Sequence, residues 1–444
     1  MDGQTGAAAA RGCATRQGGP SIAVAGAGLR GSAYAARIRA AGTGRIVAVA
    51  EPDPVRRARF AAEHGLPPER TFPGWREMAA RGRPADGVIV ATQDAEHAEP
   101  AIRFAGLGCH VLLEKPMATS EADALRIVDA VERAGVMLAV CHVLRYTGYT
   151  RALRGLVADG RIGAPVSVQH LEPVGWWHHA HSYVRGNWRR AAESGPMLMT
   201  KSCHDIDWLI HVMGEVPARV SSFGRLSHFL PERRPPGAAD RCLDCAVEAH
   251  CPYSAPRLYL SCLGDPVREA WPLGAVTDDR TRAGVVRALR EGPYGRCVYA
   301  CDNDVVDHQV VTMEFPSGAT GAFTMTAFSP AAPRQTRVFG TSGCLEGDGA
   351  RVTVRDFVTG ATEVIEPGDG PGGAFDGRHD HADDALADAF VAALASGDPS
   401  ALSSGPRESL ASHRVVWAAE RARLDGTVVE PGPQPPPAKG TVRP

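Results

Sequence analysis

The stretch Ser21–Gly31, with the sequence SIAVAGAGLRG, decides the fold of the first part of this chain. Five residues suited to a buried strand run directly into the pattern G-x-G-x-x-G, whose glycines are Gly26, Gly28 and Gly31. Where a strand turns into a helix, the first glycine permits a tight turn and the second lets the backbone approach a pyrophosphate. The third lets the helix pack closely on the strand, and free N–H groups at the helix N-terminus favour an anion. The stretch therefore predicts a dinucleotide-binding turn, with a purely structural glycine-rich turn as the alternative.

Beyond this turn, short apolar runs alternate with segments of helical period as far as Cys141. The runs are SIAVAG, RIVAVAE, DGVIVAT, CHVLLEK and VMLAVCH. This alternation is typical of βαβ units and of a parallel sheet. We therefore expect an α/β dinucleotide-binding domain of the Rossmann type over residues 20–142.

The second apolar run ends at Glu51, about 20 residues beyond the glycine pattern. A carboxylate at this place can accept hydrogen bonds from the adenosine ribose and repels a 2′-phosphate, which favours NAD over NADP. Arg56 and Arg57 are close enough in sequence to leave NADP open. A solvated glutamate at a strand end is the structural alternative.

Composition limits the class of protein. A chain of 444 residues exceeds the usual size of one hydrophobic core, so we expect two domains. A formal net charge of -2 gives no electrostatic basis for a nucleic-acid partner, and no apolar stretch predicts a membrane span. Residues 1–19 are expected to form a disordered leader without an export signal, and residues 431–444 a disordered tail. We therefore expect a cytoplasmic protein that acts on small molecules.

Two further motifs lie where the fourth and fifth predicted strands end. Residues 91–94, ATQD, precede His97, and Glu114-Lys115-Pro116 follow the run CHVLL. With the glycine pattern they resemble the glucose–fructose oxidoreductase, inositol dehydrogenase and rhizopine catabolism family (Gfo/Idh/MocA), over roughly residues 20–425. The resemblance implies an α+β substrate domain over residues 143–430 with a large open, mainly antiparallel sheet. The exposed face of that sheet commonly makes subunit contacts in the family, so we expect a homo-oligomer.

The resemblance places Lys115 beside nicotinamide and substrate. An ammonium at this point can stabilise negative charge that develops on the substrate oxygen. An exposed lysine without a function is the alternative. The residues expected to bind the cofactor are Gly26, Gly28, Leu29, Arg30, Gly31, Glu51, Thr92, His97, Glu114 and Lys115.

The second signature of the family is a histidine at the start of a helix, and residues 202–208, SCHDIDW, match it. His204 is therefore the predicted acid or base that exchanges the hydroxyl proton while hydride moves between the same carbon and the nicotinamide. Asp207 lies one helical turn on, where it could orient or charge-stabilise the imidazole. Many family members have an aspartate four residues before this histidine, but here that residue is Thr200. Either His204 acts without this carboxylate or the chemistry differs from simple dehydrogenation; a core histidine without a catalytic role is the structural alternative.

A polar and aromatic segment, EPVGWWHHAHSYVRGNW, covers residues 172–188. Its rings and hydrogen-bond donors have the density that a carbohydrate pocket needs. Metal binding by its histidines is the weaker alternative, because the spacing lacks a clear carboxylate partner. The predicted substrate-binding residues are His181, Tyr183, Arg185, Trp188, Lys201 and His204, and two or three of the first four are expected to meet substrate.

Residues from about 228 to 303 are expected to form a cysteine-rich insertion in the second domain. Cys242 and Cys245 are separated by two residues and Cys251 follows, a spacing compatible with a closed, structural Zn²⁺ site. An iron–sulfur cluster and unligated thiols are the alternatives. The expected fourth ligand is Cys297, and the other candidates for it are Cys301, Cys262 and His250.

The sequence thus predicts an NAD(H)-dependent oxidoreductase that transfers hydride between the nicotinamide and a hydroxyl carbon of a sugar, cyclitol or related polyol. One alternative is a glycosidase that oxidises its sugar transiently and regenerates NAD⁺ in each turnover, which Thr200 keeps open. A non-catalytic sensor of NAD or of a metabolite is the other, and the presence of both Lys115 and His204 argues against it.

Overall fold

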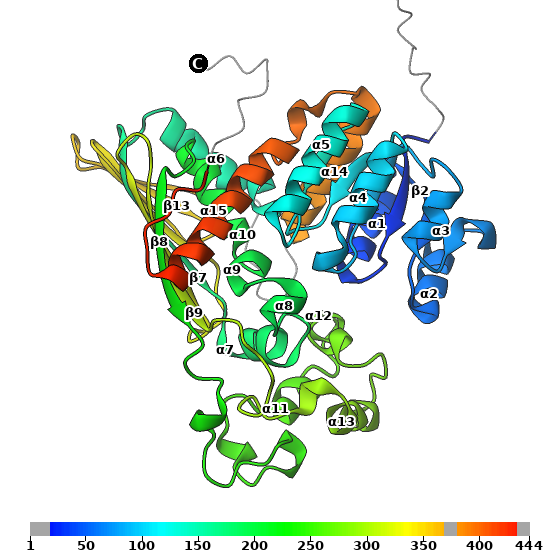
Figure 1. The fold of residues 1–444 in the computed structure, drawn as a ribbon. Coiled ribbons are helices and arrows are strands. Elements are labelled where there is room, and N and C mark those ends of the chain that lie inside the picture. The colour runs from blue at the N-terminus through cyan, green and yellow to red at the C-terminus, as the bar shows by residue number, and fades with distance from the viewer. Residues whose placement is uncertain (1–17, 368–379, 433–444) are drawn as a thin grey trace, which may run out of the picture.

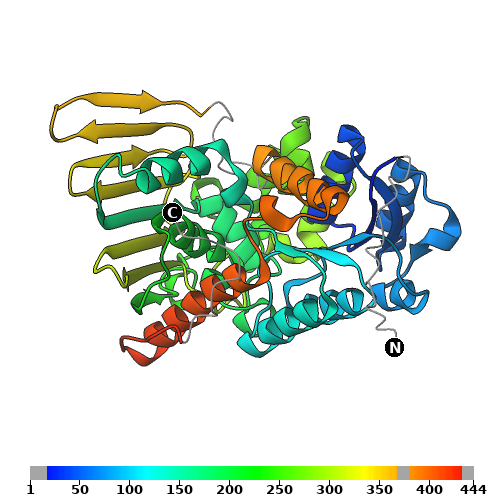
Figure 2. The ribbon, with the colours of Figure 1, turned by 90° about the horizontal axis from the view of Figure 1, so that it is seen from above.

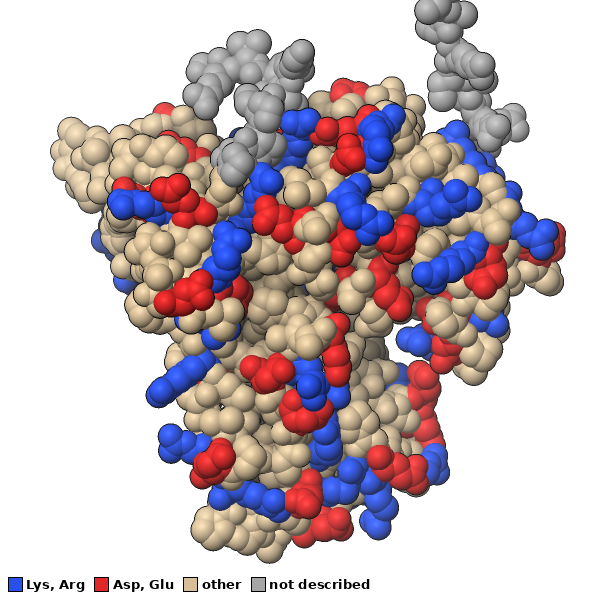
Figure 3. Space-filling model, in the orientation of Figure 1, with Lys and Arg blue, Asp and Glu red and all other residues tan. Residues whose placement is uncertain are grey.

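The computed structural model of the chain describes residues 18–367 and 380–432. These residues form two sheets of different kinds, with a separate lobe of short helices and turns beside them (Figure 1). Among them, no helix combines the length and the apolar character needed to cross a membrane. Positive and negative side chains are interspersed on the face seen in Figure 3, in keeping with the small net charge.

The first sheet is parallel and has six strands in the order β3-β2-β1-β4-β5-β6. Its order reverses direction beside β1, as in a doubly wound dinucleotide-binding fold. The strands are β1 (Ser21–Ala25), β2 (Arg45–Ala50), β3 (Thr71–Phe72), β4 (Gly87–Val90), β5 (His110–Leu113) and β6 (Leu138–Val140). The helices between them are α1 (Leu29–Ala41), α2 (Pro54–His64), α3 (Trp75–Ala80), α4 (Ala98–Gly106) and α5 (Glu121–Ala134).

Alternate residues of β1 face two separate cores on the two sides of this sheet. Ala23 packs in one core with Phe104 of α4, whereas Val24 packs in the other core with Ile38 of α1. Burial on both faces explains why these strands read as continuous apolar runs in the sequence. The predicted Rossmann domain is therefore confirmed.

The second sheet has eight strands in the order β14-β13-β12-β11-β7-β10-β9-β8. β7 and β10 run parallel and the other neighbours antiparallel, so the expected large, mainly antiparallel sheet is also confirmed. The strands are β7 (Pro165–Pro173), β8 (Arg219–Arg225), β9 (His308–Glu314), β10 (Thr320–Thr326), β11 (Gln335–Gly340), β12 (Gly343–Gly347), β13 (Val352–Asp356) and β14 (Thr362–Ile365).

Helices cover one face of the second sheet. In β10, Phe323 and Met325 are buried in the main core of this domain, together with Ile206 of α10 (Cys203–Met213) and Val415 of α15 (Pro406–Asp425). α6 (Gly148–Ala158) packs near the β13 side of the same face. Figure 2 shows these helices on one side of the sheet, and among the described residues none lies on the other.

The last two helices return to the first domain. Phe390 of α14 (Asp380–Ser396) is buried in the core that contains Tyr34 and Ile38 of α1. α15 packs along α5 and also against α10 and β8, so it joins the two sheets (Figure 1). Segments that come late in the chain therefore help to fix the first domain against the second.

The predicted insertion forms the lobe at the bottom of Figure 1. It contains the short helices α11 (Ala255–Leu260), α12 (Pro266–Ala270) and α13 (Arg282–Glu291), joined by turns. Two small apolar clusters, one around Phe229 and Val298 and one around Tyr259 and Leu289, lie apart from the main core. Neither cluster is large, so the lobe has little apolar core of its own.

Candidate active site

The glycine turn between β1 and α1 has the backbone that a dinucleotide site needs. Gly26 has a φ of 96°, and a side chain there would begin 2.3 Å from the carbonyl oxygen of Ala91. A side chain on Gly31 would begin 2.0 Å from the carbonyl oxygen of Gly26. Beside Gly28, none of the described residues other than its chain neighbours lies within 4 Å of such a position, so they leave the space before Leu29, the first residue of α1, open. The turn fits a dinucleotide, whose pyrophosphate needs both open space and the N–H groups of a helix N-terminus.

Glu51 directly follows β2 and points back toward this turn. It is 4% exposed, and its carboxylate accepts hydrogen bonds from Ala27 N–H at 2.8 Å and Asp53 N–H at 3.0 Å. Arg56 approaches the same carboxylate to 3.5 Å, whereas Arg57 donates to the carbonyl oxygen of Glu51. A negative charge therefore stands beside the glycine turn, and the arginine that could attract a 2′-phosphate already faces Glu51.

Arg30 was predicted as a cofactor contact, but its side chain binds within the protein. The guanidinium donates to Glu114 Oε1 at 2.8 Å and to both carboxylate oxygens of Asp383 at 2.6 and 2.7 Å. Asp383 lies on α14, 353 positions along the chain, so no local pattern could identify it. Any role of Arg30 toward an anion would therefore fall to its backbone N–H at the start of α1.

His97 connects the loops that follow β4 and β5. Its ring nitrogens lie 2.7 Å from Pro116 O and 3.2 Å from Thr92 O. Glu114 accepts a hydrogen bond from Lys115 N–H at 3.0 Å. These contacts hold the two loops together, so His97 and Glu114 position the lysine that lies between them in the structure.

Lys115 extends from the first domain to the second. Its Nζ donates to Thr200 O at 2.6 Å, where the short helix α9 (Met197–Thr200) ends just before α10. Burial raises the pKa of the Cys203 thiol to about 12, and the charge of Lys115 opposes this rise, so the ammonium lies near the first residue of α10. His204 is the next residue and is 5% exposed. The Lys115 ammonium therefore lies at the junction between the domains, at the turn before α10, the helix that carries His204, and the catalytic role of both residues stays a prediction.

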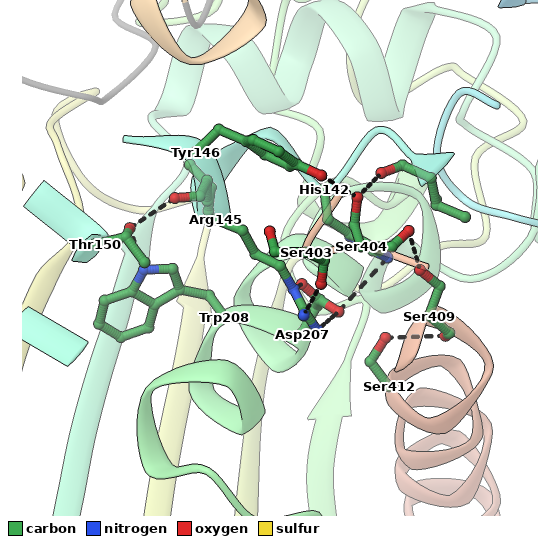
Figure 4. A network of polar contacts seen from close by, with 12 residues as sticks. His142, Arg145, Tyr146, Thr150, Asp207, Trp208, Ser403, Ser404, Ser409 and Ser412 are labelled. Carbon is green, nitrogen blue, oxygen red and sulfur yellow. Dashed lines mark hydrogen bonds and ion pairs between the residues drawn. The ribbon is translucent and has the colours of Figure 1, made fainter. Parts of the chain in front are cut away.

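Asp207, predicted to orient His204, has a strong partner elsewhere. Its carboxylate accepts from Arg145 Nε at 2.6 Å and from Nη2 at 2.7 Å. Burial would raise the pKa of Asp207, but the ion pair and hydrogen bonds with Arg145, together with the interactions with His142 and Ser412, lower it to about 2. Figure 4 shows this pair within a network that includes Ser403 and Ser404. The main partner of Asp207 is therefore Arg145, which helical spacing could not reveal.

Two other imidazoles near His204 were not identified from the sequence. The ring of His142 lies 5.8 Å from that of His204 and 5.5 Å from that of His413. His413 accepts from Met117 N–H at 2.9 Å and donates to Ser409 O at 2.7 Å. Burial lowers the pKa of His142 to about 3 and that of His413 to about 4. Both rings are therefore neutral near pH 7, and neither adds a positive charge beside His204.

Asp94 is a further carboxylate at this junction. In the sequence it appears only within the motif ATQD, and no role was predicted for it. Trp188 of the second domain donates from Nε1 to Asp94 Oδ2 at 2.9 Å. Burial raises the pKa of Asp94, and nearby positive charges, that of Lys115 included, oppose the rise. Tyr183 stacks on Trp188 at 6.0 Å, and a hydrogen bond with Thr200 partly offsets the rise that burial causes in its pKa. Tyr183 and Trp188 thus lie at the junction, and their contact with substrate stays a prediction.

The other two predicted residues of this segment contact the insertion. They lie on a wide helical turn of the π type, Ala180–Arg185. His181 Nδ1 lies 2.8 Å from the hydroxyl of Tyr259, and Arg185 donates to Tyr253 O at 2.8 Å. Both side chains are at most 2% exposed. The segment therefore divides, since one pair of side chains serves the insertion and the other pair lies at the junction.

Lys201 is paired with a buried carboxylate. Its Nζ lies 3.1 Å from one oxygen of Glu172, on β7, and Arg334 lies 3.1 Å from the other. Arg334 also forms an ion pair with Asp205 of α10. Arg334 and Asp205 were missed because such pairs join segments that are distant in sequence. The positive charge of Lys201 is therefore balanced by the carboxylate of Glu172.

The four cysteines predicted to bind metal lie around one small cavity of about 20 Å³. The ten cysteines described are all free thiols. Within residues 18–367 and 380–432, however, no three His, Cys, Asp or Glu side chains are already arranged as ligands of one metal ion. Zn²⁺ therefore stays a prediction.

Comparison with known proteins agrees with this architecture. Residues 21–142 match the oxidoreductase family with an NAD-binding Rossmann fold, named GFO_IDH_MocA, and residues 154–430 match the C-terminal alpha/beta domain of that family. An oxidoreductase from Agrobacterium radiobacter, solved with NAD+, L-tartaric acid and magnesium, has a TM-score of 0.67 over 93% of this chain and 98% of its own. At 16% identity, this likeness shows the fold alone.

Curated relatives match over shorter segments. A 1,5-anhydro-D-fructose reductase of Ensifer adhaerens is 33% identical over 43% of this chain and 57% of its own length. Inositol 2-dehydrogenase 3 of Saccharopolyspora erythraea is 34% identical over 34% and 45%, respectively. A 2,7-anhydro-N-acetylneuraminate hydratase of Escherichia coli (strain K12) is 33% identical over 33% and 38%. This chain thus spans between 38% and 57% of the length of these relatives.

The two family matches together extend over both sheets, and they include the glycine turn, Lys115 and His204. The chain therefore belongs to the Gfo/Idh/MocA family of oxidoreductases, with an NAD-binding Rossmann domain followed by the family's C-terminal α/β domain.

Proposed function

We propose that this protein is an NAD(H)-dependent oxidoreductase that transfers hydride between the nicotinamide and a hydroxyl carbon of a sugar, cyclitol or related polyol. The observation that carries the proposal is the hydrogen bond from Lys115 Nζ to Thr200 O. Through this contact the ammonium of the first domain reaches the turn from which α10 and His204 begin. An ammonium and an imidazole at one domain junction, next to a dinucleotide turn, are the groups that alcohol oxidation requires.

The proposed step uses both side chains on one substrate hydroxyl. When bound, the nicotinamide supplies the hydride acceptor or donor. During oxidation the C–H bond gives up its hydride and the O–H bond gives its proton to His204, while a carbonyl forms between the same two atoms. Lys115 would stabilise the negative charge that builds on this oxygen before the proton has left. Reduction uses the same groups in reverse.

Glu51 supports NAD as the cofactor. Its buried carboxylate lies beside the glycine turn, where each of its two oxygens accepts one backbone N–H group. Each oxygen has a further lone pair that a ribose hydroxyl could use. A ribose with free hydroxyls can donate to such a carboxylate, whereas a 2′-phosphate would place a second negative charge against it. The proximity of Arg56 to Glu51 reduces this repulsion only in part, since Arg56 is 45% exposed at its side chain.

A sugar or cyclitol is the proposed substrate class. The stacked rings of Tyr183 and Trp188 offer apolar faces, and the ion-paired Lys201 and Glu172 offer donors and acceptors for hydroxyl groups. The named relatives include a reductase of an anhydro-sugar and an inositol dehydrogenase. Both the chemistry of the junction and these names therefore favour a ring with several hydroxyls.

Thr200 favours one second candidate, a reaction that is redox-neutral overall. Thr200 cannot supply the carboxylate that many family members have before His204, and one relative is named as a hydratase rather than a dehydrogenase. In such a reaction, transient oxidation of the sugar would acidify a neighbouring C–H bond and permit elimination, after which the hydride returns. Such a reaction would make this protein a glycosidase, a hydratase or a lyase, depending on which group is eliminated and whether water is added.

The test is incubation of the full chain with NAD⁺ and a panel of sugars, cyclitols and their glycosides. Formation of NADH is followed by its absorbance at about 340 nm, a property of the cofactor. The sugar is followed by chromatography. Accumulation of NADH in step with oxidised sugar supports the dehydrogenase. Conversion of sugar without net NADH supports the redox-neutral candidate. If no panel member is converted with NAD⁺ or with NADP⁺, the result would oppose both the dehydrogenase and the redox-neutral candidate.

A matched variant separates catalysis from folding in this test. The chain has one other lysine at the junction, Lys201, so Lys115→Met and Lys201→Met remove the same charge from neighbouring places. Only the first should abolish hydride transfer while binding of NAD is retained. Equal activity of Lys115→Met and the unmodified chain would remove Lys115 from the mechanism.

We also propose that the uncovered face of the second sheet joins copies of the chain. Among the described residues, helices cover only one face of that sheet (Figure 2), and Phe223 of β8, on the other face, is 71% exposed. Exposed apolar side chains on an open sheet commonly mark a protein interface. Sedimentation should give an assembly larger than one chain, and Phe223→Glu should shift it toward the monomer.

A further inference from the structure

We infer that Cys242, Cys245, Cys251 and Cys297 bind one Zn²⁺ ion through four thiolates and so cross-link the insertion that lies beside the active-site junction. The proposed site is distinct from the dinucleotide turn and from Lys115 and His204. It is structural, so it goes beyond the reaction proposed above and does not depend on it.

Sequence spacing selected Cys242, Cys245 and Cys251, with Cys297 as one of several candidates for the fourth ligand, and the fold gathers these four thiols. The cavity of about 20 Å³ is lined by all four thiols. Cys262 and Cys301 belong to the same insertion but do not line this cavity. A water molecule needs roughly 10–15 Å³ of such space, so the cavity suits one small ion rather than a multinuclear cluster.

The backbone brings distant parts of the chain to this cavity. Arg241 and Arg296 form an isolated antiparallel bridge, and Cys297 N–H donates to Asp240 O at 2.8 Å. Because the bridge is antiparallel, Cys242 and Cys297, which follow its two partners, lie diagonally across it, and strand alternation sends both side chains to the same face. Main-chain hydrogen bonds therefore fix the positions of two of the four proposed ligands.

Tight turns supply the other two ligands. A short 3₁₀ turn covers Cys242–Asp244, and Cys245 N–H donates to Cys242 O at 3.4 Å. A second turn, Glu248–His250, ends directly before Cys251. Two cysteines on one such turn, with a third after the next turn, can face a common centre, as thiolate ligands of structural zinc do.

A buried guanidinium at the cavity favours negative charge there. Arg185 is 1% exposed and lines the cavity, and its Nη2 lies 3.5 Å from Cys242 Sγ. Its Nη1 is buried and has no hydrogen-bond partner among the residues that the structure describes. A buried donor without a partner is costly. Four thiolates around one divalent cation carry a net charge of 2−, which the guanidinium would offset.

A metal cross-link would also supply what the insertion lacks. Cys242 belongs to the small apolar cluster around Tyr259, and Cys297 belongs to the separate cluster around Phe229. An ion held by both would join the two clusters, and small lobes without a sufficient core commonly depend on such a site. Arg185 ends the helical turn that also carries Tyr183, so the site would stiffen the segment beside the proposed substrate.

Binding requires the thiols to turn inward. Among residues 18–367 and 380–432, no three candidate side chains are already arranged as ligands of one ion. Zn²⁺ is the expected ion because it prefers tetrahedral thiolate sets and has no redox chemistry. The proposal therefore predicts that metal changes the positions of these four thiols and leaves the two sheets unchanged.

The test measures metal directly on the full chain, without reference to activity. The protein is expressed without a polyhistidine tag, and its metals are determined by mass spectrometry. We expect about one zinc per chain, the count that one tetrahedral site implies. Cys245→Ser should lose most of this zinc, whereas Cys301→Ser, a thiol of similar exposure outside the cavity, should retain it.

A second measurement covers the case in which Cys245→Ser fails to fold. Zinc is removed from the unmodified chain under reducing conditions and Co²⁺ is added, while absorbance reports thiolate-to-cobalt charge transfer and tetrahedral geometry. Four thiols should become protected from a thiol-specific reagent. Absence of metal together with no cobalt–thiolate bands would overturn the proposal, and so would an iron–sulfur spectrum in the purified protein.

Discussion

Lys115 and Thr200 are 85 positions apart in the sequence, yet Lys115 Nζ lies 2.6 Å from the carbonyl oxygen of Thr200. This bond joins the loop after β5 to the turn before α10, and thereby joins the NAD-binding domain to the helix that carries His204. The family's aspartate is missing at position 200, but the backbone of the same residue still anchors the lysine. The main chain of Thr200 therefore provides a contact for the ammonium without a carboxylate side chain at this position.

Lys115→Met should lower turnover while leaving cofactor binding in place. Methionine keeps the length and the apolar stem of the side chain but removes the charge that would stabilise the substrate oxygen. Loss of one such electrostatic contact typically costs roughly 10²- to 10³-fold in kcat. Steady-state kinetics would give kcat, and calorimetry would give the Kd for NAD. Lys201→Met is the control and should act mainly on KM, because Lys201 is already paired with Glu172.

Glu51→Gln should weaken the preference for NAD over NADP. Glutamine keeps one oxygen to accept from Ala27 N–H but lacks the charge that would repel a 2′-phosphate. We expect the ratio of kcat/KM for the two cofactors to fall by about tenfold or more, which corresponds to about 1.4 kcal/mol. Asp53→Asn changes a neighbouring cap of α2 and should leave the ratio unaltered. An unchanged ratio in Glu51→Gln would exclude Glu51 from cofactor selection.

Asp94→Asn should remove the acid limb of the pH–rate profile. Asparagine can still accept the hydrogen bond from Trp188, so packing of the domains should be retained. We expect Asp94 to replace the carboxylate that many family members have at the position of Thr200. Its ionised form would then be needed, so activity should fall as the pH drops and Asp94 becomes protonated. Burial raises the pKa of Asp94, so this limb should lie above the ordinary range of an aspartate.

For Asp94→Asn we expect kcat to fall by roughly 10²-fold, the usual range for loss of an acid–base group. Trp188→Phe is the matched variant, since it removes the hydrogen bond but keeps the carboxylate, and it should shift the limb without abolishing it. Unfolding temperature should stay within a few degrees in both variants. Retention of the full profile by Asp94→Asn would assign the acid limb to another group.

Buried histidines should make the protein less stable as the pH falls below about 6.5, their ordinary pKa. Burial lowers the pKa of His142 and His181 to about 3, and that of His179 and His413 to about 4. In the unfolded chain these rings take up protons below pH 6.5, whereas in the folded protein they stay neutral. Their contribution is therefore complete above pH 6.5 and declines toward pH 4, by up to about 1.4 kcal/mol per pH unit for each ring.

Urea unfolding at several pH values between 7.5 and 5 would measure this decline, the range being chosen around the ordinary histidine pKa. The slope of the unfolding free energy against pH reports how many more protons the unfolded chain binds than the folded protein, and His142→Leu should reduce that number by about one. His250→Gln, a change at an exposed position of the insertion, should leave the slope as it is. A slope that does not differ between His142→Leu and the unmodified protein would show that His142 does not stay neutral in the fold.

The sequence by itself determined those features that depend on neighbouring residues. A single carbon added at Gly26 would collide with the carbonyl oxygen of Ala91, and one added at Gly31 with that of Gly26, so both residues must be glycine and together they leave a local pattern. The same holds for the apolar runs of the first sheet, whose strands are buried on both faces, and for the alternating strands of the second. The family resemblance, which supplied Lys115 and His204, also rests on short local motifs.

Only the tertiary structure decided which charged groups share a partner. Arg30 binds Asp383 across 353 positions, and Asp207 binds Arg145 across 62, although helical spacing had suggested His204. An ion pair depends on where two segments pack, and side-chain charge leaves no periodic mark in the sequence to reveal its partner. Packing likewise divided the segment from residue 172 to residue 188 between the junction and the insertion, because its helical turn sends neighbouring side chains in opposite directions.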